Sequence, residues 1–136
     1  MRFWTNSAAT TDVLYLDTSA FLDRLFRQKG HGAVTDALMA AQRAGESVVS
    51  SRLLRLEARR TQLRVGADWP AMDRQVRELH LLPVNEDVWR AASDIEVHVK
   101  TLDALHLATC RLVGARLLSS DEQLRSAAAA LGVPIA

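Results

Sequence analysis

The stretch Val13-Leu14-Tyr15-Leu16-Asp17 is a continuous apolar run that ends in an acid. Four apolar residues in a row, without alternating polar positions, are typical of a strand that is covered on both faces of a parallel sheet. From Ser19 onward the pattern becomes helical. A buried strand that leads almost directly into a helix predicts an α/β fold, with Asp17 at the end of the strand.

Short apolar segments alternate with longer helical ones along the rest of the chain. We expect strands at Val13–Leu16, Val48–Ser50, Leu81–Val84, Arg116–Ser119 and Val133–Ile135. We expect helices at Ser19–Arg27, Ala33–Ala44, Ser51–Val65, Trp69–Leu79, Asp87–Val99, Leu102–Val113 and Glu122–Leu131. This alternation predicts a short parallel sheet between two layers of helices, with ligands bound beyond the carboxyl ends of the strands. Residues 13–136 are expected to form a single domain, and residues 1–12 a flexible N-terminal extension.

Composition excludes several classes of protein. The 136 residues carry a formal net charge of +1, so any contact with nucleic acid would have to use a local patch. Cys110 is the only cysteine, which excludes an intramolecular disulfide and a cysteine-rich zinc site and favours a reducing cytoplasm. No secretory leader and no apolar run of membrane-spanning length is found, so we expect a cytoplasmic protein without a membrane partner.

Four acids stand where apolar segments meet polar chain, namely Asp17, Glu57, Asp103 and Asp121. Asp17 follows a predicted strand directly and Asp121 follows another closely, so both are expected at the same edge of the sheet. Two carboxylates about 4 Å apart repel by roughly 4 kcal/mol at an effective dielectric constant near 20. A fold that gathers several of them must protonate them or bind a hard divalent cation.

Each acid also has a purely structural explanation. Asp17 and Asp121 could cap the helices that follow them, and Asp103 lies in a first helical turn, where a negative charge is favoured. Capping-box spacing also occurs at Ser119 to Glu122 and at Ser120 to Gln123. For Glu57 the alternative is an ion pair with Arg60 or Arg64.

Two positions on helices weaken these structural explanations. Asp103 shares its helix face with His106 and Leu107, where a buried acid needs a partner. Glu57 projects between Leu53 and Leu54, away from the arginine stripe of the same helix. We interpret His106 as a core histidine bonded to a neighbour rather than as a metal ligand.

Four motifs in order resemble the PIN-domain family, and more narrowly VapC-type toxins of bacterial toxin-antitoxin pairs. They are Leu14-Tyr15-Leu16-Asp17-Thr18-Ser19-Ala20-Phe21-Leu22, Ser50-Ser51 leading to Leu56-Glu57, Leu102-Asp103-Ala104-Leu105-His106-Leu107-Ala108-Thr109, and Leu118-Ser119-Ser120-Asp121-Glu122-Gln123-Leu124. The resemblance covers nearly everything from residue 13 to residue 135. It implies a PIN-like three-layer sandwich whose four acids hold Mg²⁺ or Mn²⁺ and cut RNA. It also implies that Ser19 and Ser119 shape the surroundings of these acids. The chain departs from some members of that family, which carry a further carboxylate at the position of Gln123.

The function that we expect is metal-assisted hydrolysis of RNA phosphodiester bonds. Asp17, Asp103 and Asp121 would be the principal ligands, and Glu57 would bind the metal or orient a water. Helical spacing places Arg52, Arg55 and Arg59 on one face, where they could contact RNA or a partner or remain solvated.

The resemblance further implies a small cognate antitoxin and homodimerisation. Two alternatives stay open: a haloacid-dehalogenase-like phosphatase, although Ser19 stands where that class has a second Asp, and a catalytically silent PIN module that binds RNA or protein.

Overall fold

A four-stranded parallel sheet forms the centre of the computed structural model, which describes residues 12–136. Its strands are β1 (Val13–Leu16), β2 (Ser47–Ser51), β3 (His80–Leu82) and β4 (Arg116–Leu118), in the order β3-β2-β1-β4. The register pairs Tyr15 with Val49 and with Leu117, so β1 lies between β2 and β4. The expected extension at residues 1–12 lies outside the described residues except for Asp12.

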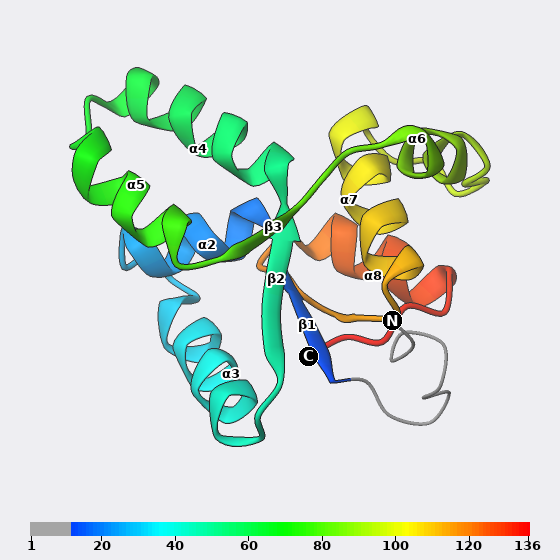
Figure 1. The fold of residues 1–136 in the computed structure, drawn as a ribbon, viewed down its shortest axis with the longest axis horizontal. Coiled ribbons are helices and arrows are strands. Elements are labelled where there is room, and N and C mark those ends of the chain that lie inside the picture. The colour runs from blue at the N-terminus through cyan, green and yellow to red at the C-terminus, as the bar shows by residue number, and fades with distance from the viewer. Residues whose placement is uncertain (1–11) are drawn as a thin grey trace.

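Helices cover both faces of the sheet, as Figure 1 shows. On one side lie α2 (Thr18–Leu25), α3 (His31–Arg43), α4 (Arg52–Val65) and α5 (Trp69–Arg77). On the other side lie α6 (Glu86–Ser93), α7 (Thr101–Leu112) and α8 (Glu122–Ala130). The predicted α/β sandwich of a short parallel sheet between helices is therefore confirmed.

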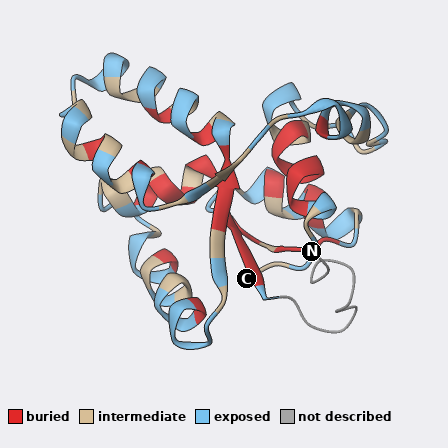
Figure 2. Ribbon diagram, viewed as in Figure 1, coloured by how far each residue is buried: buried red, intermediate tan, exposed pale blue. Residues whose placement is uncertain are grey.

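Alternate side chains of β1 pack in two separate hydrophobic clusters, one on each face of the sheet. Val13 and Tyr15 pack on the face that α7 and α8 cover, whereas Leu14 and Leu16 pack on the face of α2 to α5. The whole strand is buried, as the central red segment of Figure 2 shows. The uninterrupted apolar run follows from this, because a strand covered on both faces has no polar side.

Side chains at the strand-to-helix junctions set where several helices begin. The carboxylate of Asp17 accepts a hydrogen bond from the backbone N–H of Ala20, and Ser51 accepts one from Leu53 in the same way at the start of α4. Asp121 caps α8 by accepting from Gln123 and Leu124. The cap of α8 is therefore Asp121 itself, rather than Ser119 or Ser120 as the capping-box spacing suggested.

The predicted helix at Asp87–Val99 is too long, because α6 ends at Ser93. Beyond it Ile95, Val97 and Val99 alternate with polar residues. These three side chains are half-buried and pack against the hydrophobic cluster that contains Leu107 of α7. A two-residue period is typical of an extended segment rather than of a helix, so the sequence pattern itself argues against a helix beyond Ser93. The prediction of a strand at Leu81–Val84 is also shifted, since β3 ends at Leu82 before Pro83, which has no N–H to donate.

The expected strand at Val133–Ile135 is reduced to a single parallel bridge between Leu117 and Ile135. The backbone N–H of Leu117 donates to the carbonyl of Pro134, and the N–H of Ala136 donates to the carbonyl of Leu117. Pro134 cannot donate in return, which limits the pairing. Across residues 12–136, no helix has both the length and the apolar character that crossing a lipid bilayer would demand.

Candidate metal and nucleic-acid site

Asp17 is the most buried of the four predicted acids, with 3% of its surface exposed. Its Oδ1 accepts from the Ala20 N–H at 2.9 Å, and its Oδ2 accepts from the Ser119 hydroxyl at 2.8 Å. The Ser19 hydroxyl lies 2.9 Å from both oxygens. Burial raises the pKa of Asp17 in spite of these hydrogen bonds, so the fold holds this carboxylate where its charge is costly.

The loop after β4 places Asp121 beside Asp17. The N–H of Asp17 donates to the carbonyl of Leu118 at 3.1 Å, which aligns the ends of β1 and β4. The Ser119 hydroxyl donates to Asp17 and accepts from the Asp121 N–H at 3.0 Å. Ser19 and Ser119, the two serines that the family resemblance singled out, thus both contact Asp17, and Ser119 links it to Asp121.

A fifth acid, Asp23, which no sequence motif marks, contacts the same loop. It is 6% exposed, accepts from the Ser120 hydroxyl at 2.8 Å and accepts from the Gly30 N–H at 3.3 Å. The backbone N–H of Ser120 in turn donates to Ser19 at 3.1 Å. The only signal in the sequence was its position on the polar side of α2, which does not distinguish it from a surface acid.

We expect Gly30→Ala to destabilise the chain by about 1–2 kcal/mol. A Cβ at Gly30 would overlap Oδ2 of Asp23, so Asp23 would have to leave Ser120. Gly32→Ala is the matched control: nothing lies within 4 Å of its Cβ, and an alanine in a helix is favoured over glycine by about 0.5–1 kcal/mol. Urea denaturation measures both variants, and equal responses would contradict the close packing of Gly30 on Asp23.

Glu57 projects from α4 toward α7, away from Arg60 and Arg64. Its Oε1 accepts from the Thr18 hydroxyl at 2.6 Å and lies 2.7 Å from Nε2 of His106. Burial alone would raise the pKa of Glu57, but the hydrogen bonds from His106 and Thr18 bring it below its ordinary value. The alternative of a surface ion pair is therefore wrong, and Glu57 belongs to the interior polar network.

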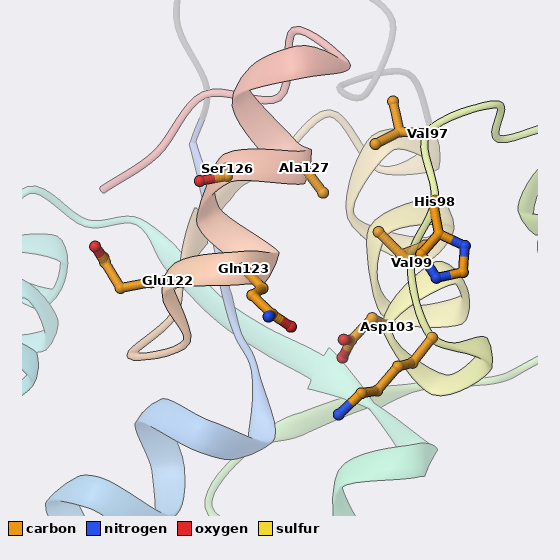
Figure 3. A pocket seen from close by; sticks show the side chains of 9 residues that line it. Val97, His98, Val99, Asp103, Glu122, Gln123, Ser126 and Ala127 are labelled. Atoms are coloured by element: carbon orange, nitrogen blue, oxygen red, sulfur yellow. The ribbon is translucent and has the colours of Figure 1, made fainter.

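Asp103 lies on the first turn of α7, half-buried, and faces a groove between α7 and α8. Figure 3 shows its carboxylate pointing toward the side chain of Gln123, and Val97 and Val99 on the chain segment that borders the groove. The groove encloses about 530 Å³. Burial and the negative charges of Asp121 and Glu57 raise the pKa of Asp103, against opposing effects of His106 and Lys100.

The four acids are neighbours, but they do not form a ready-made ligand set. Within residues 12–136, no three His, Cys, Asp or Glu side chains are arranged so that they could hold a metal ion. Asp17 is linked to Asp121 through Ser119, and its neighbour Thr18 is bonded to Glu57, while Asp103 feels the charges of Asp121 and Glu57. Their oxygens suit Mg²⁺ or Mn²⁺ in chemistry, and binding would require some of the other acidic side chains to rotate toward a common point with Glu57.

Two of the three arginines predicted on one face of α4, Arg55 and Arg59, contact residues of α5. Arg55 forms an ion pair with Asp73, which also pairs with Arg77 at 3.0 Å. The guanidinium groups of Arg55 and Arg59 lie 5.4 Å and 5.2 Å from the centre of the Trp69 ring. Arg52 is exposed at the start of α4, nearest to the strand ends.

The fold and the order of acids at the strand ends define a class of proteins. A family model described as PIN domain matches residues 14–130. The chain therefore belongs to the PIN-domain family, as its four motifs predicted.

Within that family the chain is similar to a VapC protein, as also predicted. It is 35% identical over 127 residues to Ribonuclease VapC46 of Mycobacterium tuberculosis (strain ATCC 25618 / H37Rv), covering 90% of this chain and 95% of that protein. Among solved structures it resembles a toxin-antitoxin complex from Klebsiella pneumoniae, with a TM-score of 0.59 and 21% identity over 79% of this chain and 86% of the other. This second likeness supports the fold.

Proposed function

We propose that this chain is a divalent-metal-dependent endoribonuclease, the toxin of a VapBC-type toxin-antitoxin pair. The observation that carries the proposal is the gathering of acids at the strand ends: Ser119 links Asp17 to Asp121, and Thr18, the residue after Asp17, is bonded to Glu57. In agreement with this, burial and the charges of Asp121 and Glu57 raise the pKa of Asp103. Buried carboxylates that repel one another are stabilised by a hard cation. Similarity to Ribonuclease VapC46 supports RNA as the substrate.

The side chains would divide the work between them. Asp17, Asp103 and Asp121 would hold Mg²⁺ or Mn²⁺, with Ser19 and Ser119 orienting Asp17. When bound, such a cation lowers the pKa of a water and neutralises charge on the phosphate. The lowered pKa of Glu57 keeps it ionised at neutral pH, so it can accept a hydrogen bond from the attacking water.

Several finer features belong to the same proposal. RNA would approach along the exposed start of α4, with Arg52 the cation best placed for phosphates, because Arg55 and Arg59 already contact α5. A cognate antitoxin, a homodimer and a cytoplasmic location complete the proposal, and residues 13–136 would be the single PIN domain. Membership of the PIN-domain family argues against the haloacid-dehalogenase-like alternative.

The test is cleavage of RNA by the full chain with Mn²⁺, with Mg²⁺ and with EDTA. We expect cleavage that needs the metal, and a loss of at least about 100-fold in Asp103→Asn, because even residues that only support metal ligands contribute about 10- to 100-fold. Asp87→Asn, an exposed acid 3.4 Å from Arg90 on α6, is the control and should retain wild-type activity.

Two results would contradict the proposal. Cleavage that persists both in EDTA and in Asp103→Asn would exclude the metal mechanism. A wild-type chain that cuts no RNA with either metal would instead favour the catalytically silent binding module.

A further inference from the structure

Glu57 receives two hydrogen bonds on the same oxygen. Both the Thr18 hydroxyl and Nε2 of His106 lie within 2.7 Å of Oε1. An ionised carboxylate only accepts hydrogen bonds, so the proton in the His106 contact is on Nε2. Among residues 12–136 these are the hydrogen bonds that Glu57 makes, and Oε2 accepts none.

His106 is held from its other side by Tyr15. The phenolic oxygen of Tyr15 lies 2.6 Å from Nδ1 of His106, and the two rings meet edge to face at 5.9 Å. Tyr15 is 0% exposed and His106 is 2% exposed. When Nε2 carries the single proton of the ring, Nδ1 is an acceptor and the Tyr15 hydroxyl is its donor.

The hydroxyl of Tyr15 has the right protonation for this role. A phenol keeps its proton at neutral pH, so the Tyr15 hydroxyl is available as a hydrogen-bond donor.

We propose that Tyr15 and His106 are positioning residues that fix Glu57 in the carboxylate cluster with Oε1 saturated, so that Glu57 offers the single oxygen Oε2 to a divalent cation or its water. The inference rests on the proposed function. It connects β1, α7 and α4 through two hydrogen bonds in series, from Tyr15 to His106 and from His106 to Glu57. Each member is buried or half-buried, so the rotamer of Glu57 is set before any ion binds.

The experiment measures Mn²⁺ affinity by isothermal titration calorimetry on the full chain, without RNA. We expect His106→Leu to weaken Mn²⁺ binding by about 10- to 100-fold. His106→Gln retains an N–H donor and should recover part of this loss. Tyr15→Phe removes one oxygen from a buried ring and should give an intermediate loss.

A matched control separates positioning from a general loss of stability. Thr109 is a buried residue of α7 whose hydroxyl donates to the carbonyl of Leu105 at 2.8 Å, within its own helix. Thr109→Val should lower the melting temperature and leave Mn²⁺ affinity at the wild-type value. Equal Mn²⁺ affinity in the wild type, His106→Leu and Tyr15→Phe would overturn the inference while leaving the proposed function intact.

The tautomer of His106 gives an independent readout. Nitrogen-15 NMR of the wild type should show a protonated Nε2 and an unprotonated Nδ1, and Tyr15→Phe should weaken that preference. A proton on Nδ1 in the wild type would overturn the inference even if Mn²⁺ binds. A wild type that binds no Mn²⁺ at all would remove the proposed function, and this inference with it.

Discussion

Asp17→Asn is expected to abolish RNA cleavage and, at neutral pH without metal, to raise the melting temperature of the chain. The loss of activity should be at least about 100-fold, because the variant removes a charged oxygen ligand from the proposed site. The gain in stability follows from burial, which penalises the charge of Asp17 and raises its pKa. An amide of the same shape carries no charge and still accepts the hydrogen bond from Ala20.

The stability difference should depend on pH with a definite sign. Because the pKa of Asp17 is raised in the folded state, the folded chain binds this proton at a higher pH than the unfolded chain. The free energy of unfolding of the wild type therefore rises as the pH falls through the folded-state pKa of Asp17. Below pH 3.8, the ordinary pKa of an aspartate, the carboxyl is protonated in both states and the cost of burying its charge disappears. The advantage of Asp17→Asn should therefore be full at neutral pH and shrink in acid.

Melting curves in EDTA between neutral and acid pH measure this difference directly. Asp68→Asn is the matched control, because Asp68 caps α5 in the same way but is exposed. Asparagine caps a helix about as well as aspartate, so the control should change neither stability nor cleavage appreciably. A lower melting temperature for Asp17→Asn at neutral pH would show that the charge of Asp17 stabilises the fold instead.

Leu107→Ala should cost about 2–5 kcal/mol of unfolding free energy. Leu107 is 0% exposed on α7 and packs in the cluster that contains Tyr15 and Val49 of the sheet. Deleting its side chain removes buried apolar contacts and leaves a cavity beside β1, the strand that directly precedes Asp17.

Leu112→Ala is the control for this second substitution, since it makes the same change on the same helix where the side chain is 50% exposed. It should shift the free energy of unfolding by less than about 0.5 kcal/mol. Urea denaturation measures both variants. A cost below about 1 kcal/mol for Leu107→Ala would mean that the cluster under β1 repacks around the lost side chain.

Most of the secondary structure was predictable because its signals are local. The apolar run before Asp17 marks β1, and Pro70 and Gly66 mark a helix start and a helix end. The errors were local as well. The alternating Ile95, Val97 and Val99 were assigned to a helix although their two-residue period indicated an extended segment.

Part of the site was also predictable. Parallel strands end at one edge, so an acid after β1 and an acid in the loop after β4 were predicted at the same edge of the sheet. The tertiary structure made them neighbours, because it places β1 next to β4. The prediction that His106 is a core histidine bonded to a neighbour is confirmed, but its partners could not be named. Tyr15 is 91 residues away from it in the chain, and Glu57 is 49 residues away.

The sequence by itself determined the sheet, its flanking helices and the acids at the strand ends, because periodicity and helix caps act over a few residues. Only the tertiary structure decided that the partner of Glu57 is His106, and that Asp23 accepts a hydrogen bond from Ser120. Those contacts join segments far apart in the chain. Their geometry depends on how α4 and α7 pack against the sheet, which no local pattern encodes.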